Sequence, residues 1–374
     1  MKTKDQIFTL TVLPVEKAKM LQALLSGIGI NAILEKQNIF QPIFSPGMVV
    51  KVHKNEIPAI LDLLEKEPGY EDTFQINKYE LQTPTTILVP IDFSDYSMRA
   101  CRFAFDMAAK QKMEVKLLHA YFSPYFPTAF PDADTFNAEI EDGEIARELT
   151  ERVNRQVKKF TADIRNKVLD GSLPDIPFDF IIREGIPEEE ISRWSRQHKP
   201  RLIVMGTRGK DQKEVDLIGS VTAEVIDSST IPVFAIPEDT LVRTIADIQR
   251  LAFVTNFDQR DLFGFDKLMQ LNGFKDKPIS FIYLTNKKNA DQYDRILPSI
   301  VSYFDKNYPN LNATFGKIDE DELLHNTDEF IKDNHIDVLV LTTHKRNIFA
   351  RLFNPSIAHK VVFHSDTPLL VIRN

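Results

Sequence analysis

The sequence has very little cysteine and no long apolar run, and each absence excludes a class of protein. A single cysteine, Cys101, among 374 residues cannot form a disulfide within the chain and indicates a reducing compartment. No stretch approaches the roughly 18 apolar residues of a membrane span, and residues 1–10 have no apolar segment typical of a secretory signal. The eight histidines show no metal-ligand spacing. We therefore expect a cytoplasmic protein with no metal cluster and no membrane partner.

Positive charge is also scarce. The chain has 46 Lys and Arg against 54 Asp and Glu, a net charge of -8, whereas nucleic-acid-binding proteins carry a clustered excess of positive charge. We therefore expect no nucleic-acid partner. An acidic chain that binds a polyphosphate must use local donors, and Arg208 is one candidate.

The chain divides into about three domains, as its length suggests. Residues 1–70 are predicted as strand, helix, strand, strand and helix, a small α+β βαββα unit. Its helix and following strand, from Glu16 to Ala32, resemble the ferredoxin-like modules of prokaryotic signalling proteins, and we interpret it as a regulatory or packing appendage. Residues 71–84 are polar and predict a linker.

Residues 85–240 alternate between apolar strands and amphipathic helices, including a long helix over 145–168. Nearly continuous apolar strands predict a parallel sheet covered on both faces. Ligands of such sheets bind at the carboxyl ends of strands, at the topological switch point. Asp92 and Gly206 would flank that crevice if their strands are neighbours. The predicted strands are Thr86–Asp92, Val115–Ala120, Phe178–Ile182, Leu202–Met205 and Pro232–Ile236.

The most specific pattern joins the fourth of these strands to the next helix, in the spacing Gly206-x2-Gly209-x9-Gly219-Ser220. Glycines let backbone N–H groups approach an anion without a Cβ clash. The first turn of the helix after Gly219 offers unpaired N–H donors and the positive end of the helix dipole. Ser220 can cap that helix or bind a phosphate oxygen. The pattern therefore predicts a phosphate-binding loop.

Together with Val89-Pro-Ile-Asp92-Phe-Ser94, this pattern resembles the universal stress protein family, in its ATP-binding branch. The resemblance implies a doubly wound five-stranded parallel sheet of strand order 3-2-1-4-5, with an adenine nucleotide between the first and fourth strands. It implies that Pro90, Ile91 and Asp92 contact the adenosine end. The residues implied at the phosphates are Gly206, Gly209, Gly219, Ser220, Val221 and Thr222, with Arg208 among them as a basic donor.

Asp92 has two possible roles. A carboxylate at a strand end can accept hydrogen bonds from ribose hydroxyls or help to hold magnesium, so the expected cofactor is ATP, with or without magnesium. Alternatively, Asp92 caps the following helix together with Ser94. The sequence leaves both open.

Residues 247–374 repeat the middle domain in degenerate form. Residues 202–237 align without a gap on 338–373, and the apolar pattern is kept, which predicts a second sheet of the same kind in tandem. The glycines are replaced, and side chains or a proline obstruct a phosphate. We therefore expect one nucleotide site that is live and one that is lost. The replacements are Thr342 for Gly206, Lys345 for Gly209, Pro355 for Gly219 and Asn256 for Asp92.

In the family, paired domains associate through their last strands, so the resemblance implies that residues 231–236 and 367–373 pair within the chain. A homodimer stays open. Two functions are compatible with the sequence: an ATP-binding regulator with an unknown protein partner, or a slow ATPase or adenylyl-transferring enzyme. The sequence shows no nucleophile beside a base and no P-loop lysine, which an enzyme of this kind would need. A bulky residue at position 219 would favour a third function, a scaffold that binds no nucleotide, but this position is a glycine. We predict the regulator.

Overall fold

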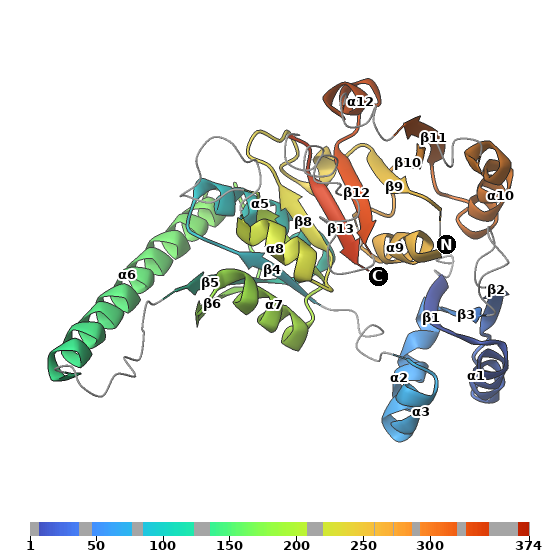
Figure 1. Cartoon of the computed structure of the whole chain (residues 1–374), viewed down its shortest axis with the longest axis horizontal. Helices are drawn as coiled ribbons and strands as arrows, with labels where there is room; N and C mark the ends of the chain where they lie inside the picture. Colours follow the sequence, from blue (N-terminus) through green and yellow to red (C-terminus); the bar gives the residue numbers. More distant parts are fainter. Residues whose placement is uncertain are drawn as a thin grey trace.

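The structure, a computed structural model, contains one three-stranded and one ten-stranded sheet (Figure 1). It describes residues 7–36, 47–76, 85–122, 135–207, 220–257, 259–271, 273–285, 292–319, 327–343 and 366–373. Within these ranges, no helix has both the length and the apolar character to cross a membrane.

The N-terminal unit is an antiparallel sheet with helices on one face. Its strand order is β1-β3-β2, and its core includes Leu21, Val50 and Ile60, from a helix, a strand and a second helix. The elements are β1 (Ile7–Pro14), α1 (Val15–Gly27), β2 (Ile33–Lys36), β3 (Gly47–His53), a 3-10 turn (Lys54–Glu56), α2 (Ile57–Lys66) and α3 (Gly69–Thr73).

The predicted linker over 71–84 is wrong for its first part. Helix α3 extends to Thr73, and Phe74 and Ile76 beyond it are buried in the core of the N-terminal unit. Thr11 Oγ1 donates a hydrogen bond to Phe74 O at 3.0 Å. The segment is mostly polar, but Phe74 and Ile76 pack into the core of the N-terminal unit.

The first half of the large sheet has the strand order β6-β5-β4-β7-β8, with all neighbours parallel. Its first strand, β4, lies between β5 and β7, so the chain winds outward from it in both directions. The elements are β4 (Thr86–Pro90), α5 (Asp95–Gln111), β5 (Glu114–Tyr121), α6 (Thr135–Leu169), β6 (Phe178–Glu184), α7 (Pro187–His198), β7 (Leu202–Gly206), α8 (Ser220–Ser228) and β8 (Val233–Ile236).

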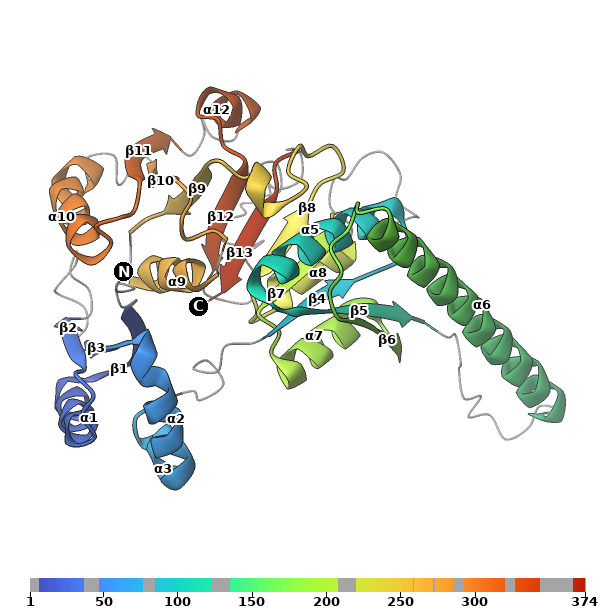
Figure 2. The ribbon, with the colours of Figure 1, turned by 180° about the vertical axis from the view of Figure 1, so that it is seen from behind.

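Helix α6 begins at Thr135, before the predicted start at residue 145. Its first part projects from the molecule in both views (Figure 2). The later turns of α6 pack against the sheet, where Phe160 and Ile164 are buried in the core.

The second half has the order β11-β10-β9-β12-β13, again with parallel neighbours. Strand β13 pairs with β8 antiparallel, with Leu369 opposite Ala235 and Val371 opposite Val233, and this pairing makes one sheet of both halves. The fold is therefore α/β with a large, mostly parallel sheet. The elements are β9 (Leu251–Thr255), α9 (Gln259–Gln270), β10 (Ile279–Thr285), α10 (Gln292–Asn307), β11 (Ala313–Asp319), α12 (Thr327–Asp333), β12 (Val338–Thr343) and β13 (Leu369–Arg373).

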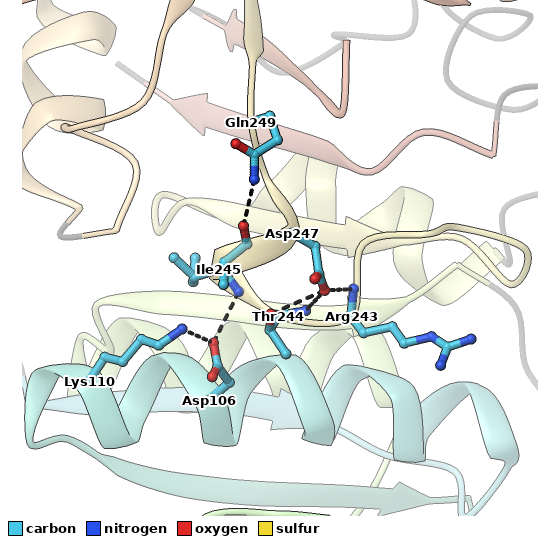
Figure 3. A network of polar contacts seen from close by, with 8 residues as sticks. Asp106, Lys110, Arg243, Thr244, Ile245, Asp247 and Gln249 are labelled. Carbon is cyan, nitrogen blue, oxygen red and sulfur yellow. Dashed lines mark hydrogen bonds and ion pairs between the residues drawn. The ribbon is translucent and has the colours of Figure 1, made fainter. Parts of the chain in front are cut away.

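The connection between the halves is fastened to α5 (Figure 3). Asp106 on α5 accepts a hydrogen bond from Ile245 N at 3.0 Å and pairs with Lys110 at 2.9 Å. Asp247 accepts from Arg243 N at 2.9 Å and Thr244 N at 2.8 Å. The bond from Ile245 to Asp106 holds the connection against α5, and the bonds to Asp247 fix the local turn.

Candidate functional site

The carboxyl ends of β4 and β7 lie side by side at the switch point of the first half. Ile87 pairs with Leu202 and Leu88 with Ile203 in parallel register. Asp92 follows β4 and Gly206 ends β7, so both lie at the same edge of the sheet. The sequence made this crevice conditional on neighbouring strands, and the structure meets that condition.

Asp92 organises the turn between β4 and α5. Its Oδ1 accepts hydrogen bonds from Ser94 N at 3.0 Å, Ser94 Oγ at 2.5 Å and Ser97 Oγ at 2.6 Å. Asp92 N donates to Ser97 Oγ at 2.9 Å. Ser94 is the N-cap of α5, since its Oγ accepts from Ser97 N. The capping role that the sequence left open for Asp92 is therefore present.

Phe93 turns the chain from strand to helix with a φ of 63°. A left-handed conformation costs a bulky residue roughly 1–2 kcal/mol, so packing must hold it in place. The Phe93 ring lies 4.4 Å from the ring of His119 and 5.7 Å from that of Phe160. His119 Nδ1 lies 2.8 Å from Ile91 O, and because a carbonyl oxygen only accepts, the imidazole N–H donates.

Gly206 allows β7 to end against the first turn of α5. A Cβ on Gly206 would lie 3.0 Å from Tyr96 Cβ and 3.1 Å from Tyr96 O. Thr222 Oγ1 on α8 donates a hydrogen bond to Gly206 O at 3.0 Å, which ties that helix to the strand end. Close packing against Tyr96 therefore favours glycine at this position.

The remaining predicted residues differ in what the structure describes of them. Pro90 and Ile91 are buried, and Ile91 N donates to Leu118 O at 2.8 Å. Val221 packs against the apolar cluster on the other face of the sheet. Ser220 begins α8, and its side chain is outside the described part. Arg208, Gly209, Gly219, Lys345 and Pro355 lie outside the described residues.

The corresponding edge of the second half is arranged differently. Buried Asp261 accepts hydrogen bonds from Asn256 N at 2.8 Å and Thr255 Oγ1 at 2.9 Å. Thr342, which aligns with Gly206, donates its hydroxyl to the other oxygen of Asp261. The carboxylate here comes from the helix rather than the strand end, and a threonine side chain lies between β12 and α9.

Sequence reasoning missed four residues of these two turns: Tyr96, Ser97, His119 and Asp261. For Ser97 and Asp261, the spacing in the sequence was a usable signal. Ser97 lies five residues after Asp92, and Asp261 lies five after Asn256. The Ser97 side chain accepts a hydrogen bond from Asp92 N, and the Asp261 side chain accepts one from Asn256 N.

No covalent or metal chemistry is evident among the described residues. Cys101 on α5 is fully buried, and burial raises the pKa of its thiol, which disfavours the reactive thiolate. Within the described ranges no group of three or more His, Cys, Asp or Glu is placed to hold a metal ion.

Comparison with known proteins places these features in a family. The model of the universal stress protein family matches residues 84–237 and 326–373, more than half of the chain. A universal stress protein of Methanocaldococcus jannaschii is 30% identical over 154 residues, which are 40% of this chain and 93% of that protein. The universal stress protein YxiE of Bacillus subtilis is 27% identical over 150 residues, 40% of this chain and 97% of its own.

A solved structure extends the likeness across both halves of the large sheet at the level of the fold. The universal stress protein of Archaeoglobus fulgidus DSM 4304 has a TM-score of 0.51 and 16% identity, and the match covers 78% of this chain and 99% of that one. The chain belongs to the universal stress protein family.

Proposed function

We propose that this protein is a nucleotide-dependent regulator of a stress response that binds one ATP per chain. The observation that carries the proposal is the adjacency of Asp92 and Gly206 at the switch point of a parallel sheet, where ligands of such sheets bind. The glycine pattern from Gly206 to Ser220 starts at that edge. The adenosine end would contact Pro90, Ile91 and Asp92.

The described residues fit such a ligand. Three hydrogen bonds to Oδ1 fix the orientation of the Asp92 carboxylate, so it is preorganised to accept from ribose hydroxyls or to assist a magnesium ion bound to phosphates. Gly206 and Thr222 hold the ends of β7 and α8 together. The phosphates would take backbone N–H groups between residues 206 and 222, with Arg208 as the basic donor.

We assign one site rather than two, because the second half has the features of a degenerate tandem copy. The ungapped alignment sets β7 on β12 and β8 on β13. At the strand end, Thr342 binds Asp261 where Gly206 has no side chain. We propose that the second copy acts as a scaffold, joined to the first through β8 and β13, and that the N-terminal unit is a ferredoxin-like appendage. A cytoplasmic location and an unidentified protein partner belong to the same proposal.

Titration calorimetry with ATP tests the site. Wild type should bind one ATP per chain, and Gly219→Pro should abolish binding, because proline removes an N–H donor and adds a ring in the loop. The matched control is Pro355→Ala, at the aligned position of the second half, which should still bind one ATP. Two equivalent sites, or normal binding by a folded Gly219→Pro chain, would contradict the proposal.

The small molecule that co-purifies separates a regulator from an enzyme. We expect ATP to be retained intact on the wild-type chain and to be absent from Gly219→Pro. Multiple-turnover release of ADP or AMP by wild type, lost in Gly219→Pro, would instead identify an enzyme.

A further inference from the structure

A cavity lies beside α5. It has a volume of about 490 Å³ and is enclosed by α5, the end of α6 and the chain from Ile236 to Arg243. Met98, Leu173 and Val242 supply an apolar lining. Its volume falls within the range of small-molecule sites, roughly 300–1,000 Å³.

Four basic side chains from three segments line this cavity: Arg99 and Arg102 on α5, Lys167 on α6 and Arg243 on the connection. Among the described residues none of them has a carboxylate oxygen within 4.0 Å. Cations that converge without such a partner repel one another, and an anion between them relieves this repulsion. The guanidinium fork is matched to phosphate oxygens.

The lining has three acidic residues, Asp95, Glu238 and Asp239, and the first two lie near the start of α5. Asp95 is in the first turn of α5, whereas Arg99 and Arg102 are about 6 Å and 10 Å further along at 1.5 Å per residue. Glu238 accepts a hydrogen bond from Tyr96 OH at 3.2 Å, which places it near the same end of α5. Arg102 and Lys167 both act on Asp170, whose pKa is lowered chiefly by hydrogen bonds from Ser172. The first turn of α5 is thus the acidic part of the lining, whereas the cations lie further along, with the exposed carboxylate of Asp170 near two of them.

We propose that this cavity is a second ligand site, for a small phosphomonoester that carries hydroxyl or amino groups. The phosphate lies between Arg99, Arg102 and Lys167. The hydroxyl or amino groups donate to the carboxylates at the first turn of α5. This site is separate from the proposed ATP site and does not depend on it.

Glycerol 3-phosphate and inorganic phosphate are the probes, measured by titration calorimetry on the full chain. Arg99→Gln combined with Arg102→Gln should weaken binding of glycerol 3-phosphate about tenfold or more, because two charge-assisted hydrogen bonds are lost. Inorganic phosphate should bind more weakly than glycerol 3-phosphate, because it has no group for the carboxylates at the first turn of α5. The matched control is Arg147→Gln combined with Arg155→Gln, on the exposed part of α6, which should leave binding unchanged.

The Gly219→Pro chain separates the two sites. It should bind glycerol 3-phosphate as wild type does, whether or not wild type binds ATP. The proposal is overturned if neither probe binds, if the folded Arg99→Gln/Arg102→Gln chain binds with wild-type affinity, or if the Gly219→Pro chain loses the probe. The last result would assign the phosphate to the loop at the end of β7.

Discussion

At the scale of single residues, Gly206 and Thr342 show how one side chain changes the edge of a sheet. At Gly206 Tyr96 lies so close that a Cβ would fit only if its neighbours shifted. At Thr342 the side chain is accommodated and bonds to Asp261. Phe93 and Phe257, by contrast, are a shared feature, with φ values of 63° and 53° at aligned turns. The two halves therefore share the backbone conformation after the first strand. They differ in the residue at the facing strand end, glycine in the first half and threonine in the second.

Replacing Gly206 with alanine tests the close approach to Tyr96. We expect Gly206→Ala to lower the free energy of unfolding by about 1–3 kcal/mol, because the neighbouring atoms at 3.0 and 3.1 Å include backbone that must shift. Gly316→Ala in β11 is the control, since its Cβ would meet only Ile282 Cδ1 at 3.9 Å. Urea denaturation compares the two. Equal stability of both variants would show that α5 moves away from β7 at no cost.

At the scale of elements, the strands could be predicted because buried parallel strands are continuous apolar runs, as in Leu202–Gly206 with its buried Leu202 to Met205. The start of α6 could not, because residues 135–145 include Asn137, Asp142 and Gly143, whose intrinsic helix propensity is weak. Asp92 and Gly206 could be placed at the same edge of the sheet, because the carboxyl ends of neighbouring parallel strands meet there. The roles of Ser97 and Asp261 were missed, because the two residues differ in type and only their shared spacing of five residues from Asp92 and Asn256 connects them.

The connection between the halves is stabilised by Asp247, which receives Arg243 N, Thr244 N and Thr244 Oγ1. Asp247→Ala should lower the free energy of unfolding by about 1 kcal/mol, the usual cost of a lost cap. Asp276→Ala, at an exposed position, is the control and should change stability little. Guanidinium denaturation measures both, and an equal effect would show that the caps of Figure 3 do not contribute.

The same contacts have a pH dependence. Burial, the largest single effect on Asp247, raises its pKa, but the hydrogen bonds from Arg243 and Thr244 outweigh it and the pKa is lowered. A lowered folded-state pKa gives stability that is present above the ordinary pKa near 3.9 and is lost as the pH falls through the folded value. The difference in stability between wild type and Asp247→Ala should therefore shrink below about pH 4.

At the scale of the whole molecule, the N-terminal unit lies against the second half (Figure 1). Its contact is a buried polar cluster. Thr9 donates to Asp266 at 2.8 Å, and Tyr308 donates to the same carboxyl. Lys51 pairs with Glu35 at 3.0 Å and lies 3.5 Å from Tyr303 OH. Burial raises the pKa of Asp266, and the charge of Lys51 acts against that shift. The unit is thus held by groups that depend on each other for charge balance.

Removing the cation of this cluster should be costly. Lys51→Met leaves Glu35 and Asp266 without their ammonium group, and breaking a buried pair costs about 3–5 kcal/mol. Lys66→Met is the matched control, because Lys66 and its partner Asp62 are 69% and 62% exposed and an exposed pair contributes at most about 1 kcal/mol. Denaturant unfolding of both variants measures the two losses of stability. A similar small loss in both would show that the N-terminal unit is only loosely attached.

The cluster should also make stability fall at alkaline pH. Burial and the charge of Asp266 raise the pKa of Tyr303 to about 12, whereas an unfolded tyrosine ionises near 10. For Lys51, burial lowers the pKa, but the charges of Tyr303, Asp266 and Glu35 together raise it by more. The net shift of the pKa is therefore upward. Both groups hold protons in the folded state that the unfolded chain releases. The free energy of unfolding must therefore decrease as the pH rises from about 10 to 12.

Tyr303→Phe isolates the tyrosine part of this dependence. The variant should be less stable than wild type at pH 9, because Lys51 loses its contact with the hydroxyl, but its stability should fall less steeply between about pH 10 and 12, because one of the two linked protons is gone. Tyr70→Phe, a ring packed on Phe74 outside the cluster, should keep the wild-type slope. If Tyr303→Phe has the wild-type slope as well, the alkaline loss arises from other groups and Tyr303 is not coupled to docking of the N-terminal unit.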